Sequence, residues 1–432
     1  LAQGGVHPKT AQALARHSTI TLTMDRYSHS SREDEARALS TLPDLSPSQT
    51  STFGREPHSN DQRKSSASGS AELDGPEGSE EDFEERRLAR HADAAGKAQI
   101  AADGGHISRN PETPVALLFD FLNGLHDAAN SIATVVSTRL ISPVWAVVFA
   151  AVGNFAAYWL VPLHVADTIG KGIINKDMVT PGVVFGALIG AMFWNVVTWI
   201  KGIPSSSSHA LLGGLLGAGI AHAGIDAVES KKTIETIFAI FLSPIIGFAL
   251  AMLMVLLTSW LFKGFQPRRA EGVFKTLHLF SSAAYSISHG GNDAQKTMGI
   301  IAVLLYSTGH LEGEFHIPTW VVIACYLAIS LGTLSGGWKI IKTMGTKITK
   351  LNHHTGFCAS TAGSIVVFSA SYMGIPVSTT HAITGSVIGT GAARKASAVR
   401  WGVAGRVVTA WFITIPMSAA VGAIFYTLTQ MF

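Results

Sequence analysis

The stretch GIPSSSSHALLGGLLGAG, residues 202 to 219, decides the fold because it places four serines and a histidine between two long apolar runs. The chain repeats this motif at residues 374 to 391 as GIPVSTTHAITGSVIGTG, and nine of the 18 aligned positions are identical. A hydroxyl-rich motif that occurs twice in an apolar chain indicates an internal duplication. Duplicated halves are typical of membrane transporters.

The composition changes from polar to apolar near residue 115. The 432 residues are 47% hydrophobic and only 14% charged, whereas soluble proteins carry about 25% charged residues. Each of ten apolar segments comes close to the roughly 20 residues that a membrane span needs. They are residues 115–138, 143–163, 180–200, 204–224, 234–262, 276–306, 317–337, 355–373, 376–393 and 402–431. Segments after each Gly-Ile-Pro are candidates for re-entrant helices.

A second pair of motifs supports the duplication. NGLHDAANSIAT at 123–134 aligns with HGGNDAQKTMGI at 289–300, and Asp127 then matches Asp293. Five segments per repeat is an odd number, so the second copy must be inverted in the membrane. We therefore predict an all-α membrane protein of about ten transmembrane or re-entrant helices in two inverted five-segment repeats. The predicted domains are repeat 1 at 114–262, a cytoplasmic loop at 263–275 and repeat 2 at 276–432.

Basic residues in the short loops predict the orientation. One side has four, namely Lys171, Lys176, Lys231 and Lys232. The other has thirteen, namely Arg139, Lys201, Lys263, Arg268, Arg269, Lys275, Lys339, Lys342, Lys347, Lys350, Arg394, Lys395 and Arg400. The side rich in Lys and Arg faces the cytoplasm. We expect a multi-pass protein of the inner (cytoplasmic) membrane with both termini outside the cytoplasm.

Ionisable residues at membrane depth are costly and commonly functional. In the first and sixth segments they are His126, Asp127, His289, Asp293 and Lys296. Gly124, Gly290 and Gly291 lie beside them and predict a helix break at equivalent places in the two halves, which points to a substrate site. A buried polar network that only holds helices together is the alternative.

The hydroxyl clusters predict two helix N-termini that bind an anion. Pro204 and Pro376 each precede Ser or Thr residues, which cap helices well. A helix N-terminus offers free N–H groups and a partial positive charge. The added hydroxyl donors are Ser206, Ser207, Ser208, Ser378, Thr379 and Thr380. His126, His289, His209 and His381 are candidate proton carriers, and the alternatives for His209 and His381 are ligands or partners of a neighbouring backbone. Glycines at 213, 217, 219, 385, 389 and 391 predict close helix packing.

Residues 115–432 resemble the inorganic phosphate transporter (PiT) family through FLNGLHDAANSIAT, SHGGNDAQKTMG, WNVVTWIKGIPSSSSHALLGG and GIPVSTTHAITGSVIG. The resemblance implies a symporter that moves phosphate inward with H⁺ or Na⁺. It implies a site built from the two aspartate motifs and the two hydroxyl-rich helix ends. The matching residues are Asp127, Asn130, Asn292, Asp293 and the Ser/Thr clusters.

Lys296 departs from the pattern of the sodium-coupled members of the family that this chain resembles. Those members have Asn-Asp-x-x-Asn in both motifs. The first motif here is HDAAN, with Asn130, and the second is NDAQK. An ammonium cannot ligate Na⁺, but it can replace it by neutralising Asp293 one turn away. NDAQK resembles the proton-coupled bacterial branch, whose members also take phosphate as a neutral divalent-metal complex. We therefore favour H⁺ over Na⁺ as the coupling ion.

The polar N-terminal region carries a separate resemblance. HPKTAQALARHSTITLTMDRYSH, within residues 1–46, resembles the C-terminal end of tyrosine recombinases, with His17 and Tyr27 at the positions of the late histidine and the nucleophile. A tyrosine attacks a phosphodiester poorly without cations to stabilise the charge that develops. The arginines of that family would lie upstream, so we interpret the segment as an inert remnant. Residues 47–113 have too little apolar surface to fold and are predicted to be a disordered linker.

The function predicted from the sequence is secondary active import of inorganic phosphate and not an enzymatic activity. Alternatives are sodium coupling, another small oxyanion such as sulfate or arsenate, a channel and a DNA recombinase. The expected partners are phosphate and the lipid bilayer, with a homodimer left open and no nucleic acid. We expect no cofactor and no resident metal. Cys325 and Cys358 provide neither a disulfide framework nor metal-site spacing.

Overall fold

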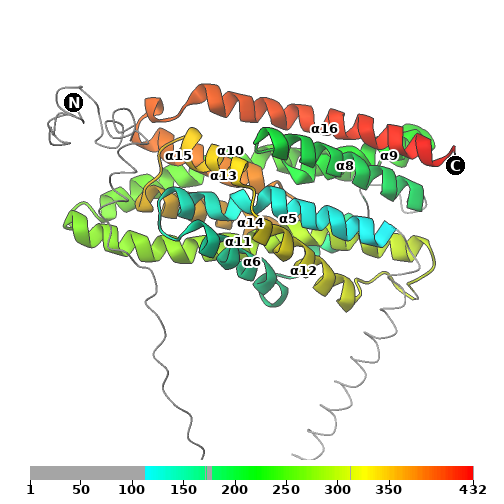
Figure 1. The fold of residues 1–432 in the computed structure, drawn as a ribbon, viewed down its shortest axis with the longest axis horizontal. Helices are drawn as coiled ribbons and strands as arrows, with labels where there is room; N and C mark the ends of the chain where they lie inside the picture. The colour runs from blue at the N-terminus through cyan, green and yellow to red at the C-terminus, as the bar shows by residue number, and fades with distance from the viewer. Residues whose placement is uncertain (1–111, 171, 173–177, 312, 432) are drawn as a thin grey trace, which may run out of the picture. The chain divides into compact units, whose positions relative to one another are not determined.

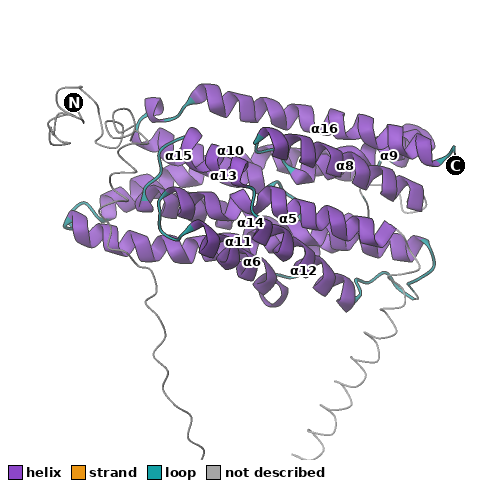
Figure 2. Ribbon diagram, viewed as in Figure 1, coloured by secondary structure: helices purple, strands orange, loops and turns teal. Residues whose placement is uncertain are grey.

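All regular elements in the computed structural model are helices over the residues it describes, which are 112–170, 172, 178–311 and 313–431 (Figure 2). The recombinase-like segment with His17 and Tyr27, and nearly all of the predicted linker, lie outside these residues. The described helices belong to one unit, Gly78–Phe432.

The two halves contain the same order of helices. The first half has α5 (Glu112–Ser137), α6 (Pro143–Leu160), α7 (His164–Gly170), α8 (Pro181–Lys201), α9 (Ser207–Ala223) and α10 (Ser230–Leu261). The second has α11 (Pro267–Ser307), α12 (Thr319–Ser335), α13 (Trp338–Lys342), α14 (His353–Tyr372), α15 (Thr379–Arg394) and α16 (Trp401–Thr429). Each predicted apolar segment coincides with one of the longer helices, while the short α7 and α13 were not predicted.

Several helices are long and apolar enough to cross a membrane. By length and composition these are α6, α8, α9 with the turn after it, α10 and α16, and a sixth is α12 together with the bent segment that follows it at 65°. Helices α5, α11 and α14 are long enough but less apolar, and α15, with 16 residues, is shorter than a membrane span. The structure thus has the several apolar helices of a multi-pass membrane protein, and ten spans stays a prediction.

Helix packing follows the same pattern in both halves. Helix α9 packs on α16 and α15 packs on α10, and Figure 1 shows α16 running beside α8 and α9. Gly213 and Gly217 on α9 contact the backbone of α16, and Gly385 and Gly389 on α15 contact the backbone of α10. A side chain at any of these positions would collide with the neighbouring helix. The predicted role of these glycines in close packing is confirmed.

The predicted helix breaks at Gly124, Gly290 and Gly291 are wrong, because α5 and α11 run continuously through these residues. The glycines instead allow close approach. A Cβ atom at Gly124 would collide with the carbonyl of Ile329 on α12, and one at Gly290 would lie 2.6 Å from the backbone of Asn154 on α6. Tertiary contact therefore outweighs the low helix propensity of glycine.

Helix α11 also begins earlier than the sequence predicted. It starts at Pro267, so most of the predicted loop at 263–275 is helical. Proline is favoured at the first position of a helix because its missing N–H needs no partner there. The residues that follow are polar, and an apolar pattern could not reveal this part of the helix.

Two hydrophobic clusters lie on either side of a polar layer. Along α5, the first cluster contains Ala116 and Phe119 and the second contains residues from Ala129 to Val135. Between them α5 buries Asp120, Asn123, His126 and Asp127. We use the name polar layer for these residues and the buried polar side chains of α9, α11 and α15 that surround them. The candidate site lies in this layer.

Candidate functional site

The two hydroxyl-rich motifs form identical helix starts. Ser206 caps α9 by accepting a hydrogen bond from the His209 backbone N–H at 3.2 Å, and Ser378 caps α15 by accepting one from His381 N–H, also at 3.2 Å. The predicted caps are confirmed. Each cap uses one hydroxyl of its cluster, and the next hydroxyls along the chain are left to make other contacts in the polar layer.

In the first half, the Asp127 carboxylate is held by two polar groups. Ser207 donates a hydrogen bond to Oδ2 at 3.0 Å, and His126 Nδ1 lies 2.6 Å from Oδ1. The other ring nitrogen of His126 lies 3.1 Å from the Thr198 hydroxyl. Asp127 and His126 are 1% and 2% exposed, so this pair is closed off from solvent.

In the second half, Asp293 has the equivalent contact and an added cation. Thr379, which aligns with Ser207, donates to Asp293 Oδ2 at 2.9 Å. Lys296 forms an ion pair with Oδ1. His289 Nε2 lies 3.2 Å from Oδ2, and its Nδ1 lies 3.0 Å from the side-chain oxygen of Asn154.

Two further hydrogen bonds connect the halves. Asn130 of the first half donates to Thr380 at 2.9 Å and approaches Thr379 at 3.4 Å. Lys296 of the second half donates to Ser208 at 2.5 Å. Asn130 aligns with Lys296, and Ser208 aligns with Thr380, so these crossed bonds are equivalent in the duplication. The structure thus brings both aspartate motifs and both hydroxyl clusters to one place.

Asp127, His289 and Asp293 form a group that could hold a cation. One ligand atom from each lies within 4.8 Å of the others, and all three residues are buried. Carboxylate and imidazole groups are common ligands of divalent transition metals. The sequence predicted no resident metal, and this grouping depends on tertiary contact between α5 and α11.

Three predicted residues make contacts outside this centre. The side chain of Asn292 donates to Ser371 at 3.0 Å. His209 and His381 instead lie against each other, with ring centroids 4.4 Å apart. None of their ring nitrogens has a hydrogen-bond partner, and Trp411 stacks on His381 at 3.8 Å. A role for these histidines as proton carriers stays a prediction.

Tyr285 and Asn154 are among the contacting residues that were missed from the sequence. The Tyr285 hydroxyl donates to the backbone carbonyl of Thr379 at 2.9 Å and so holds the start of α15. Asn154 on α6 orients His289 and donates to Thr333 at 2.8 Å. Tyr285 lies eight residues before Asp293, a helical spacing that could have indicated it. Asn154 gives no comparable signal.

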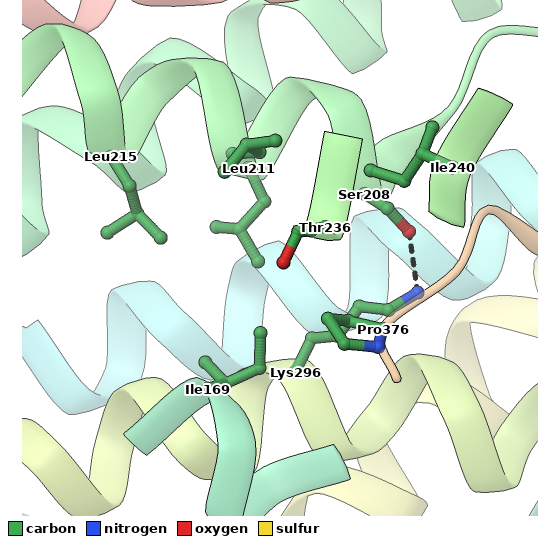
Figure 3. A pocket seen from close by; sticks show the side chains of 9 residues that line it. Ile169, Ser208, Leu211, Leu215, Thr236, Ile240, Lys296 and Pro376 are labelled. Carbon is green, nitrogen blue, oxygen red and sulfur yellow. Dashed lines mark hydrogen bonds between the residues drawn. The ribbon is translucent and has the colours of Figure 1, made fainter. Parts of the chain in front are cut away.

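A small apolar pocket reaches the centre at Lys296 (Figure 3). Leu211 and Leu215 of α9 line it together with Thr236 and Ile240 of α10. Figure 3 shows the Lys296 amine turned from the pocket wall toward Ser208. Because the charged side chains of the centre are all buried, the structure represents a state in which the centre is closed to solvent.

A closed polar layer between apolar clusters, built from duplicated helix ends in a protein with several apolar helices, is the arrangement typical of a membrane transporter. The profile of the phosphate transporter family matches residues 123–422. The chain belongs to this family.

Individual relatives support the assignment. The chain is 59% identical over 312 residues to a "Probable low-affinity inorganic phosphate transporter" of Rhizobium meliloti, a match that covers 72% of this chain and 93% of the relative. It is 44% identical to a protein of the same description from Bacillus subtilis, over 73% of this chain and 95% of the relative. A solved structure described as "The sodium-dependent phosphate transporter" is 27% identical with a TM-score of 0.69, and covers 74% of this chain and 98% of its own. The family match concerns residues 123–422, so the recombinase resemblance of residues 1–46 stays a prediction.

Proposed function

We propose that this chain is a symporter that imports inorganic phosphate across the cytoplasmic membrane together with protons. The observation that carries the proposal is the duplicated centre. Each half supplies an aspartate and a hydroxyl that bond within the half, Asp127 with Ser207 and Asp293 with Thr379. Hydroxyl and amide donors without clustered arginines suit a small oxyanion that must leave again. The printed descriptions of the relatives support phosphate as that oxyanion.

The charges of the centre support obligatory cotransport of cations. Asp127, Asp293 and Lys296 sum to a net charge of −1 when the histidines are neutral. A phosphate dianion would raise this to −3 in a buried place, where unpaired charge is very costly. Inward movement of each negative charge also opposes the membrane potential by about 2.3 kcal/mol per 100 mV. Positive charge must therefore accompany phosphate.

Lys296 supports protons over Na⁺ as the coupling ion. Its ammonium contacts Asp293, Ser208 and the Val377 carbonyl, which are oxygen ligands of the kind that Na⁺ would need. Because the ammonium occupies these oxygens, they are not free to bind Na⁺. It also neutralises Asp293, so a sodium ion is not needed to balance that charge. The first half, with Asn130, has no such cation, so sodium coupling is the alternative that the test must separate.

Phosphate carried as a neutral divalent-metal complex would meet the same charge requirement. The grouping of Asp127, His289 and Asp293 supports this variant because its ligand atoms are close enough to share one ion. The metal would then be part of the substrate. Phosphate uptake in the presence and absence of Mg²⁺ or Mn²⁺ distinguishes the complex from the free anion.

The movement that we propose around this centre is alternating access by rocking of the two inverted repeats. The pairs α9–α16 and α15–α10 each join a helix of one half to a helix of the other. The intra-half bonds of the two aspartates can persist during such a movement, while the crossed bonds of Asn130 and Lys296 must break. The excess of Lys and Arg at one side supports an orientation with both termini outside.

The test is uptake of ³²P-phosphate into proteoliposomes under an imposed pH gradient or Na⁺ gradient. Wild type is compared with Asp127→Asn, Asp293→Asn and a control, Asp226→Asn, which removes an exposed carboxylate. We expect uptake driven by the pH gradient, lost in both centre variants and retained in the control.

Other results would redirect the proposal. Uptake driven by Na⁺ alone would refute proton coupling. Competition by sulfate or arsenate as strong as that by phosphate would refute selectivity for phosphate. Absence of phosphate uptake under both gradients, with monodisperse protein, would refute the proposed substrate.

A further inference from the structure

A third buried carboxylate lies in the polar layer, and nothing above gives it a function. Of the residues the structure describes, the buried acids are Asp120, Asp127 and Asp293. Asp127 has His126 beside it, and Asp293 has Lys296 and His289. Asp120 is fully buried and forms no ion pair within the described part of the chain. The Thr297 hydroxyl donates to its Oδ1 at 3.1 Å, and Oδ2 has no partner.

The position of Asp120 connects it with the centre. It precedes Asp127 by seven residues, which is close to two turns, so the two carboxylates lie on one face of α5. Its partner Thr297 directly follows Lys296 on α11. Asp120 is therefore about two turns from Asp127 toward the Glu112 end of α5, which faces outside in the proposed orientation.

The surroundings of Asp120 do not compensate a negative charge. The titratable groups close enough to act on it are Asp293 and Lys296 from α11 and Cys325 and Tyr326 from α12. Lys296 is the one cation among them, and its ammonium is already bound by Asp293, Ser208 and the Val377 carbonyl. An isolated ion of this kind in a protein interior is strongly unfavourable.

A proton would resolve an unmet hydrogen bond at the same place. Asn123 lies one turn after Asp120 on α5, near enough for a side-chain hydrogen bond. The side-chain oxygen of Asn123 and Oδ2 of Asp120 are both buried acceptors without a donor. Buried polar atoms are rarely left unpaired. A turned Asn123 amide would supply a donor to Oδ2 but leave the charge, whereas a proton on Oδ2 supplies a donor and also removes the uncompensated charge.

We infer that Asp120 is the carboxyl that binds the coupling proton, an inference that rests on the proposed proton symport. Ionised Asp120 places a third negative charge beside Asp293 and so opposes entry of an anion into the centre. Protonated Asp120 removes this repulsion. Phosphate therefore binds more tightly when the proton is bound, and by reciprocity the proton binds more tightly when phosphate is bound. That linkage is what coupled transport requires.

The test separates coupling from substrate binding. Asp120→Asn keeps the size of the side chain and mimics the protonated state permanently. We expect it to lose accumulation of ³²P-phosphate under a pH gradient by at least tenfold. It should keep exchange of internal for external phosphate without a gradient. The exchange rate of wild type should fall at alkaline pH, while that of Asp120→Asn should stay level. Asp120→Glu should restore gradient-driven accumulation, and Asp226→Asn should behave as wild type.

Two results would overturn the inference. One is gradient-driven accumulation by Asp120→Asn at the wild-type level. The other is loss of exchange together with accumulation in folded protein, which would make Asp120 part of the phosphate site or of the scaffold.

Infrared difference spectra of the purified protein between acid and alkaline pH test the proton directly, without phosphate. The wild type should show the carbonyl stretch of a protonated carboxylic acid that Asp120→Asn lacks and Asp120→Glu shifts, and absence of this band would refute the inference. If wild type shows the band and transports no phosphate, the proposed function fails and the proton site stands.

Discussion

Replacement of Lys296 by methionine tests the central ion pair most directly. Methionine has a similar length and no charge, so it fills much of the same space. The change removes the ion pair with Asp293 and the hydrogen bonds to Ser208 and the Val377 carbonyl. It leaves Asp293 buried, with the Thr379 hydroxyl at 2.9 Å and His289 at 3.2 Å as its remaining contacts.

The expected loss of stability follows from the charge on Asp293, which no longer has a counter-ion. Removal of one member of a buried ion pair costs about 3–5 kcal/mol, because the other charge loses its compensation. A large domain loses about 2 °C of melting temperature per kcal/mol, so a fall of about 6–10 °C is expected. The double variant Lys296→Met/Asp293→Asn removes both charges. It should return to within about 1 kcal/mol of wild type, since apolar replacement of a whole pair is commonly neutral.

Thermal unfolding in detergent at neutral pH, followed by tryptophan fluorescence, measures these differences. Lys231→Met, at an exposed lysine of α10, is the matched control and should change the melting temperature by less than about 2 °C. A single variant as stable as wild type, or a double variant as unstable as the single one, would refute the role of Lys296 as the counter-ion of Asp293.

Three further sets of substitutions test the duplicated helix ends and their packing. Gly217→Ala places a Cβ against the Ala419 backbone and should destabilise the α9–α16 contact. Gly405→Ala is the control, because this glycine lies in open space on α16. It should stabilise the protein by about 0.5–1 kcal/mol in the same melting assay. Ser206→Ala and Ser378→Ala each remove a cap of equal length and should each cost about 1 kcal/mol, and unequal losses would argue against equivalent ends. Tyr285→Phe removes the bond to the Thr379 carbonyl, worth about 0.5–1.5 kcal/mol, and should lower ³²P-phosphate uptake about two- to tenfold; unchanged uptake would make Tyr285 a packing residue only.

Helices that are apolar along their whole length were predictable from the sequence, because a membrane and a protein interior both favour apolar side chains. Apolar runs located α6, α8, α10 and α16, because these helices are long and apolar enough to cross a membrane. The start of α11 at Pro267 was not predictable in this way, since its first turns are polar. The expected break at Gly290 was wrong for a different reason. Its low helix propensity reflects the isolated chain, and its contact with Asn154 exists only in the fold.

The centre was predictable to the extent that it is duplicated. Alignment of the two halves identified Asp127, Asp293 and the hydroxyl clusters, and the structure brings them together. Asp120 has no aligned acidic partner in the second half, so the comparison of motifs did not reveal it. Its spacing of seven residues from Asp127 was the available signal. Asn154 lies outside both motifs and becomes visible only through its contact with His289.

The two halves differ in the crossed hydrogen bonds that connect them, and this difference bears on the mechanism. The bonds within each half are alike, since Ser207 meets Asp127 as Thr379 meets Asp293. The crossed bonds differ, because Asn130 contributes a neutral amide and Lys296 an ammonium. Of these two crossed bonds, the one from Asn130 is neutral and the one from Lys296 is charged, and charged hydrogen bonds are roughly twice as strong. In the proposed alternating access, the second half thus holds the stronger of these two contacts.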